Sequence, residues 1–155
     1  MQNSKNEGKK RIKIFLDSSV IIAAILSPIG GSFRLIRESL FKNYALLISE
    51  YVLDECIRIL GMKFPMKANI LPLFLTNFNF KILRDPTQKE VENLIEIINF
   101  QDAPVLAGAL KYKVEYLISL DKKDFLNQKV LEFARKKGLS ILTPKEFLQA
   151  ESPKM

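Results

Sequence analysis

The stretch IKIFLDSSVIIAAIL, residues 12–26, decides the fold. Its first five residues, Ile12–Leu16, form a short run rich in β-forming side chains and predict a strand. An apolar helix is predicted to follow over Ser18–Leu26, with Ser18 or Ser19 as its N-cap. A strand that passes straight into a helix is typical of proteins built on a parallel sheet.

The same alternation continues to the end of the chain. We predict further strands over residues 45–48, 80–83, 114–120 and 139–142. Between them we predict helices that begin at Ser32, at Glu50 (ending at Gly61), at Thr87 with Glu90 as a capping box, at Asp102, at Lys129 (ending at Gly138) and at Pro144. Residues 64–78 contain Pro65 and Pro72, which predict a broken pair of helices.

These elements predict an α/β fold with a central, mainly parallel sheet and helices on both faces. We expect one domain over residues 12–149, a basic arm over residues 1–11 and a short tail over residues 150–155. The helix from Thr87 is expected to continue to Ile98, because Val91, Leu94, Ile95 and Ile98 recur at helical spacing.

The composition excludes several kinds of chemistry. The chain of 155 residues has no histidine and one cysteine, Cys56, which excludes a Ser-His-Asp triad, a Cys–His pair, a zinc site of several Cys or His ligands and an internal disulfide. Carboxylates, hydroxyls and amines remain for catalysis. Carboxylates act most readily through a hard cation such as Mg²⁺ or Mn²⁺.

The charge is concentrated at the N-terminus. The formal net charge is +7, and residues 1–13 contain five basic side chains against Glu7. This arm has two equally weighted interpretations, which are electrostatic contact with phosphates and a solvated terminus. The first ten residues are polar, and no stretch reaches the roughly 20 apolar residues of a membrane span, so we expect a soluble, cytoplasmic protein without a membrane partner.

Acidic residues stand where the predicted elements meet. Asp17 directly follows the first predicted strand and Asp121 the fourth, so both are expected at one edge of the sheet. Asp102 begins a helix, and Glu55 falls about 40° from Ile59 at the edge of an apolar helix face. Taken singly, Asp102 fits an N-cap and Glu55 is only a weak signal.

Together these acids predict a metal site. Two carboxylates about 4 Å apart repel by about 1 kcal/mol in water and about 4 kcal/mol at an effective dielectric constant of 20. A cation offsets that repulsion. Asp124 and Ser19 lie beside the predicted site, although, taken singly, a turn residue and a helix cap explain them better.

Four segments in order carry a family resemblance. FLDSS at residues 15–19, ISEYVLDECIRIL at 48–60, DAPVLAGA at 102–109 and LISLDKKDF at 117–125 together resemble the PIN-domain nucleases, and above all the small prokaryotic toxins paired with antitoxins. ILTPKEFL at residues 141–148 is similar to the last strand and helix of that family. The resemblance implies a three-layer α/β/α fold and a ribonuclease dependent on Mg²⁺ or Mn²⁺.

The resemblance also implies site residues. The acidic quartet that holds the metal falls on Asp17, Glu55, Asp102 and Asp121, with Asp124, Ser19 and Ser119 as auxiliary residues. Many members have Thr then Asn where this chain has Ser18 and Ser19, which keeps an oxygen and implies altered tuning of the site. Glu50 and Asp54 are nearby acids, but helix phase and family position both favour Glu55. The implied products are a 5′-phosphate and a 3′-hydroxyl.

Several alternatives remain open from the sequence. Lys122 and Lys123 either contact flanking phosphates or belong to a solvated loop. The uncharged segment 68–80 is a homodimer contact, an antitoxin groove or ordinary core cover. The alternative function is a PIN-like adaptor that binds RNA or protein with little catalysis. A phospho-receiver domain is disfavoured because no second acid adjoins Asp17 and none ends the strand at residues 45–48.

Overall fold

A five-stranded parallel sheet runs through the middle of the protein, in the order β3-β2-β1-β4-β5. The computed structural model describes residues 10–151. The strands are β1 Ile12–Leu16, β2 Tyr44–Ser49, β3 Lys81–Leu83, β4 Tyr116–Ile118 and β5 Ser140–Leu142. β1 is central and pairs with β2 on one side and β4 on the other.

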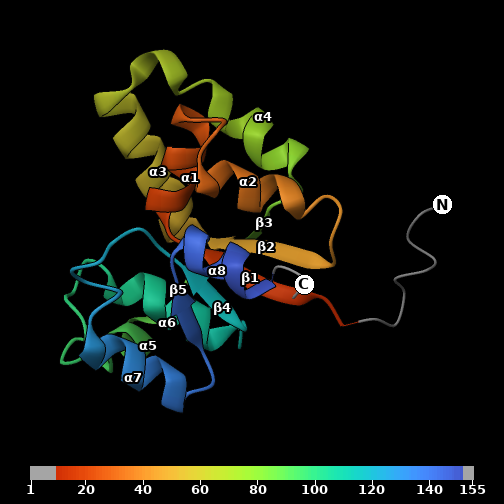
Figure 1. Ribbon diagram of the computed structural model, residues 1–155. Helices are drawn as coiled ribbons and strands as arrows, with labels where there is room; N and C mark the ends of the chain where they lie inside the picture. Colours follow the sequence, from red (N-terminus) through yellow and green to blue (C-terminus); the bar gives the residue numbers. More distant parts are fainter. Residues whose placement is uncertain (1–9, 152–155) are drawn as a thin grey trace.

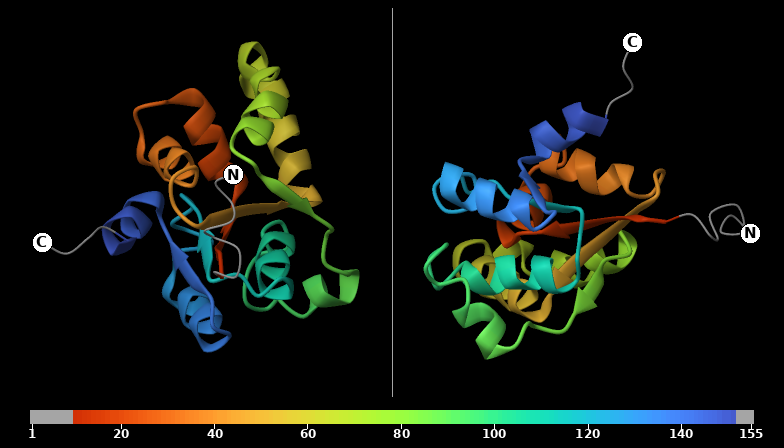
Figure 2. Two further views of the ribbon diagram at one scale, coloured as in Figure 1. Left: turned by 90° about the vertical axis from the view of Figure 1, so that its right-hand side faces the viewer. Right: turned by 90° about the horizontal axis from the view of Figure 1, so that it is seen from below.

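Helices cover both faces of this sheet (Figure 1). They are α1 Ser18–Leu26, α2 Gly31–Glu38, α3 Glu50–Lys63, the short 3-10 helix η2 Pro65–Lys67, α4 Ile70–Asn77, α5 Gln88–Glu92, α6 Ala103–Lys111, α7 Gln128–Lys136 and α8 Pro144–Glu151. α1 to α4 lie on one side of the sheet and α5 to α7 on the other, while α8 returns to pack beside α2 (Figures 1 and 2). The predicted three-layer α/β/α architecture is confirmed.

The core forms where β1 meets both layers. Ile14, Phe15 and Leu16 are fully buried. α6 packs closely against this strand at Gly108, where an added Cβ would lie 3.2 Å from the Phe15 ring. This contact brings the beginning of α6, and with it Asp102, toward the end of β1.

The predicted bounds of α1 are confirmed, but several predicted caps and one helix end were wrong. α1 is capped by Asp17, whose carboxylate accepts the Ser18 N–H, and α2 is capped by Gly30 and not by Ser32. α3 continues through Gly61 to Lys63 and ends before Pro65, because a residue that precedes proline disfavours the helical conformation.

The bounds of other elements also differ from those predicted. The capping box of Thr87 and Glu90 is confirmed, but α5 ends at Glu92, and the N–H groups of Ile97 and Ile98 both bond to the Leu94 carbonyl in tight turns. β4 is confined to Tyr116–Ile118, the three residues that pair with both β1 and β5. α8 continues to Glu151, inside the expected tail.

The predicted N-terminal arm and C-terminal tail fall largely outside the described residues. Only residues 10 and 11 of the arm and residues 150 and 151 of the tail belong to the described part. Within residues 10–151 no single helix is long and apolar enough to cross a membrane; α1 and α2 meet the length and composition criteria only when combined, and they are bent by 100°.

Candidate metal centre

Asp17 lies at the carboxyl end of β1, where it is 5% exposed. Three donors hold its carboxylate. Oδ1 accepts the Ser18 N–H at 2.9 Å, and Oδ2 accepts the hydroxyls of Ser19 and Ser119, each at 2.8 Å. Burial raises the pKa of Asp17 above its ordinary value, against the lowering effect of the two hydroxyl hydrogen bonds.

Two serines connect Asp17 to the loop that follows β4. Ser119 donates to Asp17 and accepts the Asp121 N–H at 3.0 Å, and the Ser19 hydroxyl accepts the Leu120 N–H at 3.1 Å. The ends of β1 and β4 are therefore fastened side by side. Asp17 and Asp121 lie at one edge of the sheet, as parallel strands require.

Glu55 reaches the same edge from α3. Its Oε1 accepts the Ser18 hydroxyl at 2.6 Å, and its charge contributes to the raised pKa of Asp17. Glu50 and Asp54, the other acids of this helix, are exposed. The helix phase inferred from the sequence therefore selects the acid of α3 that faces Asp17.

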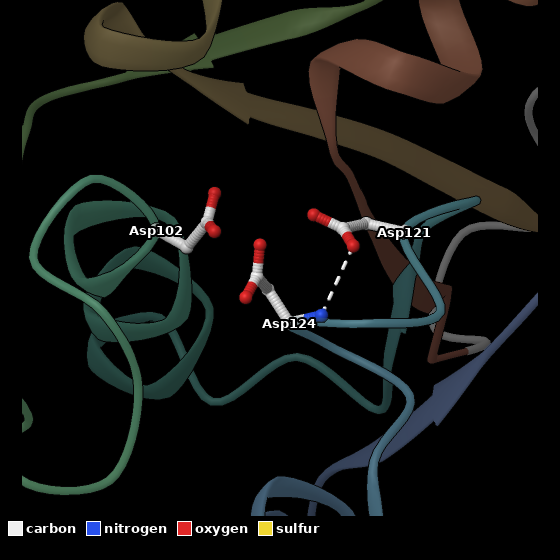
Figure 3. Close-up of side chains that lie close together, drawn as sticks. All are labelled: Asp102, Asp121 and Asp124. Carbon is white, nitrogen blue, oxygen red and sulfur yellow. Dashed lines mark hydrogen bonds between the residues drawn. The ribbon is translucent and has the colours of Figure 1, made fainter.

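Asp102, Asp121 and Asp124 form the tightest group. Each offers one carboxylate oxygen, and these oxygens lie within 4.8 Å of one another. Figure 3 shows the three carboxylates facing a common space, with Asp102 at the start of α6 and the other two on the loop after β4. Asp121 Oδ1 also accepts the Asp124 N–H at 3.0 Å, which fixes the loop.

The charges of these groups act on one another. Burial raises the pKa of Asp102 to about 6, and the carboxylates of Asp17, Asp121 and Asp124 add to the rise. Burial also raises the pKa of Tyr51, with further contributions from Glu55 and Asp102. The five carboxylates of Asp17, Glu55, Asp102, Asp121 and Asp124, here called the acid cluster, thus share one electrostatic environment.

No cationic side chain within residues 10–151 is ion-paired with the acid cluster. The ion pairs found there use other acids, namely Glu38, Glu90 and Glu115. Lys122 and Lys123 are exposed next to Asp121 and belong to none of these pairs. Carboxylate oxygens without a basic partner are the donors that hard divalent cations prefer, so the donor set fits Mg²⁺ or Mn²⁺.

The structure groups the predicted residues in a specific way. Asp102 and Asp121 share the 4.8 Å group with Asp124, which the sequence had ranked as auxiliary. Asp17 is connected to that group through Ser119, and Glu55 is connected to Asp17 through Ser18.

Sequence reasoning missed Asn99 and one role of Ser18. Asn99 donates from Nδ2 to Asp102 Oδ2 at 2.7 Å, and its Oδ1 accepts the Asp102 N–H at 3.0 Å. An Asn three residues before the Asp at a helix start is a signal for such a local turn. Ser18 was considered only as a cap, yet its hydroxyl orients Glu55.

Comparisons with known proteins agree on the fold. No protein-family model matches the sequence, and no curated protein matches it. Among solved structures, this chain is similar to VapBC2 from Rickettsia felis, with a TM-score of 0.63 and 20% identity over 85% of this chain and 98% of that one. VapBC2 was solved bound to a DNA fragment from its promoter.

Two other solved structures are similar. PAE2754 from Pyrobaculum aerophilum has a TM-score of 0.60 and 17% identity, over 90% of this chain and 94% of its own. Mycobacterium tuberculosis VapC20, a sarcin-ricin loop cleaving toxin, has a TM-score of 0.54 and 18% identity, over 71% of this chain and 91% of its own. At these identities the likeness establishes the fold, and the PIN-like fold expected from the sequence is confirmed.

Proposed function

We propose that this protein is an Mg²⁺- or Mn²⁺-dependent ribonuclease that hydrolyses RNA phosphodiester bonds at the acid cluster. The observation that carries the proposal is the convergence of carboxylates that have no basic partner within residues 10–151, with three of them inside a 4.8 Å group. The shared fold adds support, since one similar structure is that of a toxin that cleaves the sarcin-ricin loop.

In this proposal Asp17, Glu55, Asp102 and Asp121 hold the cation, with Asp124 as an auxiliary acid. A divalent cation held by these residues would lower the pKa of a bound water and would stabilise the negative charge that develops on the oxygens around phosphorus. A carboxylate has about four acceptor positions, and Asp17 uses three of them within the protein, so one remains for a ligand.

The surrounding residues orient the acids. Ser19 and Ser119 fix the Asp17 carboxylate, and Asn99 fixes that of Asp102. Lys122 and Lys123 are exposed beside Asp121, where they would contact phosphates that flank the cleaved bond. No step requires an imidazole base, which agrees with a chain that has no histidine.

The proposal includes protein partners. We infer that the protein is a toxin with a cognate antitoxin, by analogy with VapBC2. A homodimer contact is assigned to the face that contains residues 68–80, where Leu71, Phe74 and Leu75 are buried but Leu73 is 66% exposed. A cytoplasmic location is consistent with Cys56 being a free, buried thiol.

Cleavage of RNA tests the proposal. Purified protein is incubated with a mixture of single-stranded and structured RNA in Mn²⁺, beside EDTA and an Asp121→Asn variant. Asp54→Asn is the matched control, because Asp54 is exposed on α3 outside the acid cluster. Cleavage that is lost with EDTA and with Asp121→Asn, but retained with Asp54→Asn, supports the nuclease. Intact RNA and no metal binding would favour the adaptor.

A further inference from the structure

Phe100 is an exposed aromatic side chain next to the acid cluster. Of the 11 phenylalanines, only Phe100 and Phe41 are exposed, at 73% and 80%, and the other nine are buried or half-buried. Phe100 precedes Asp102 by two residues, so their Cα atoms lie within about 7 Å of each other. Phe41 lies just before β2, at the opposite edge of the sheet.

The backbone around Phe100 is held in place. The side-chain amide oxygen Oδ1 of Asn99 accepts the N–H groups of Gln101 and Asp102, each at 3.0 Å. The Tyr51 hydroxyl donates to the Gln101 carbonyl at 2.6 Å, which ties the same turn to α3. The ring therefore stands on an anchored turn that also positions Asp102.

A second apolar side chain is exposed on the other part of the cluster. Leu120 is 43% exposed and directly precedes Asp121, and its N–H is fixed by the Ser19 hydroxyl. Exposed apolar groups thus adjoin two of the grouped aspartates. Water is a poor solvent for such groups, whereas the faces of nucleic-acid bases cover them favourably.

We propose that Phe100 stacks on an unpaired base of the RNA beside the cleaved bond and so makes the site selective for single-stranded segments. This inference rests on the proposed nuclease function. Bases within an A-form helix are stacked on one another, whereas unpaired bases can be splayed onto an aromatic ring. Phe100 is then a specificity-determining residue, and the chemistry stays with the acids.

Kinetics separate stacking from a structural role. Phe100→Ala is expected to raise KM for an unstructured RNA about tenfold, with kcat within about twofold of the parent, while Phe100→Tyr retains the parent KM. Phe41→Ala is the matched control and leaves both constants unchanged. Circular dichroism melting checks that each variant is folded.

An abasic substrate identifies the contact. The bases beside the cut are removed one at a time, and kcat/KM of the parent is measured on each abasic RNA. The abasic RNA that lowers kcat/KM of the parent most is then given to Phe100→Ala. If the ring stacks on that base, Phe100→Ala loses nothing further on the abasic RNA, because the two changes remove one interaction. If the losses in kcat/KM from Phe100→Ala and from removal of the base multiply, the proposal is overturned.

Because the chain has no tryptophan, a single introduced tryptophan reports RNA binding by its fluorescence. Phe100→Trp and Phe41→Trp are each combined with Asp121→Asn to block cleavage, and fluorescence is followed as a short RNA is added in Mn²⁺. Quenching for Phe100→Trp alone supports stacking. Equal kcat/KM in Phe100→Ala and the parent would overturn it, whereas failure of the parent to cleave any RNA would overturn the proposed nuclease function itself.

Discussion

Asp17 is a carboxylate that the fold buries without a cationic partner among the described residues. Its three hydrogen bonds favour the charged form, but burial and the nearby Glu55 carboxylate outweigh them and raise its pKa. Asp102 is in a similar position, with a pKa of about 6. The metal-free protein therefore contains acids whose ionisation costs folding free energy, and a cation would recover that cost.

The metal-free protein is expected to become less stable as the pH rises through about 6. Because the folded pKa of Asp102 is raised from 3.8 to about 6, its stabilising contribution is complete below pH 3.8 and is lost through the folded value. Asp17 acts in the same direction. The measurement is Tm in EDTA at about pH 5 and about pH 7, with Mn²⁺ then added at the higher pH.

Matched variants identify the groups responsible. Asp102→Asn should flatten the pH dependence, since the amide resembles the protonated acid, and Asp17→Asn should blunt the rise in Tm with Mn²⁺. Asp54→Asn should behave as the parent. If Mn²⁺ does not change the Tm of the parent, that result would contradict a metal site in the acid cluster.

Much of the acid cluster could be predicted from the chain, because parallel strands end at one edge and helix phase gives the direction of Glu55. Asp17, Asp121 and Glu55 follow from those two rules. Asn99 and the grouping of Asp124 depend on turns whose hydrogen bonds no periodicity encodes. The helix predicted through Ile98 was also wrong because turns replace its second half. Ile95, which has helical spacing in the sequence, is 52% exposed.

Strand and helix identities were predicted more reliably than their ends. Gly61 was expected to end α3, since glycine commonly follows a helix. The structure instead places it within the helix, in open space for a Cβ. Gly138, expected to end the helix before it, has φ +85°, the left-handed conformation that glycine adopts without strain.

The two glycines should therefore respond oppositely to alanine. Gly61→Ala is expected to stabilise the protein by about 0.5–1 kcal/mol, because alanine favours the helix and meets no neighbour within 4 Å. Gly138→Ala is expected to destabilise it by about 1 kcal/mol through the positive φ. Urea unfolding of both variants gives the free energies, and a loss of stability in Gly61→Ala would contradict the placement of this residue inside α3.

Exposed apolar side chains gather on one part of the molecule. Of the thirteen large hydrophobic residues that are exposed within residues 10–151, six belong to the face formed by α3, η2, α4 and β3: Ile57, Met62, Met66, Ile70, Leu73 and Ile82. A groove of about 480 Å³ between Leu53 of α3 and Leu71 of α4 belongs to the same face. Segment 68–80 thus contributes both to the core, through Phe74, and to this surface.

We expect this face to pair two copies of the chain, because association would remove several apolar side chains from water at once. Light scattering should give a mass that rises from monomer toward dimer with concentration. Leu73→Asp should hold the protein as a monomer, since it places a charge on the exposed side of α4. Ile29→Asp is the matched control, as Ile29 is 95% exposed on the turn between α1 and α2. A parent that stays monomeric at high concentration would exclude the homodimer and leave the face free for another protein.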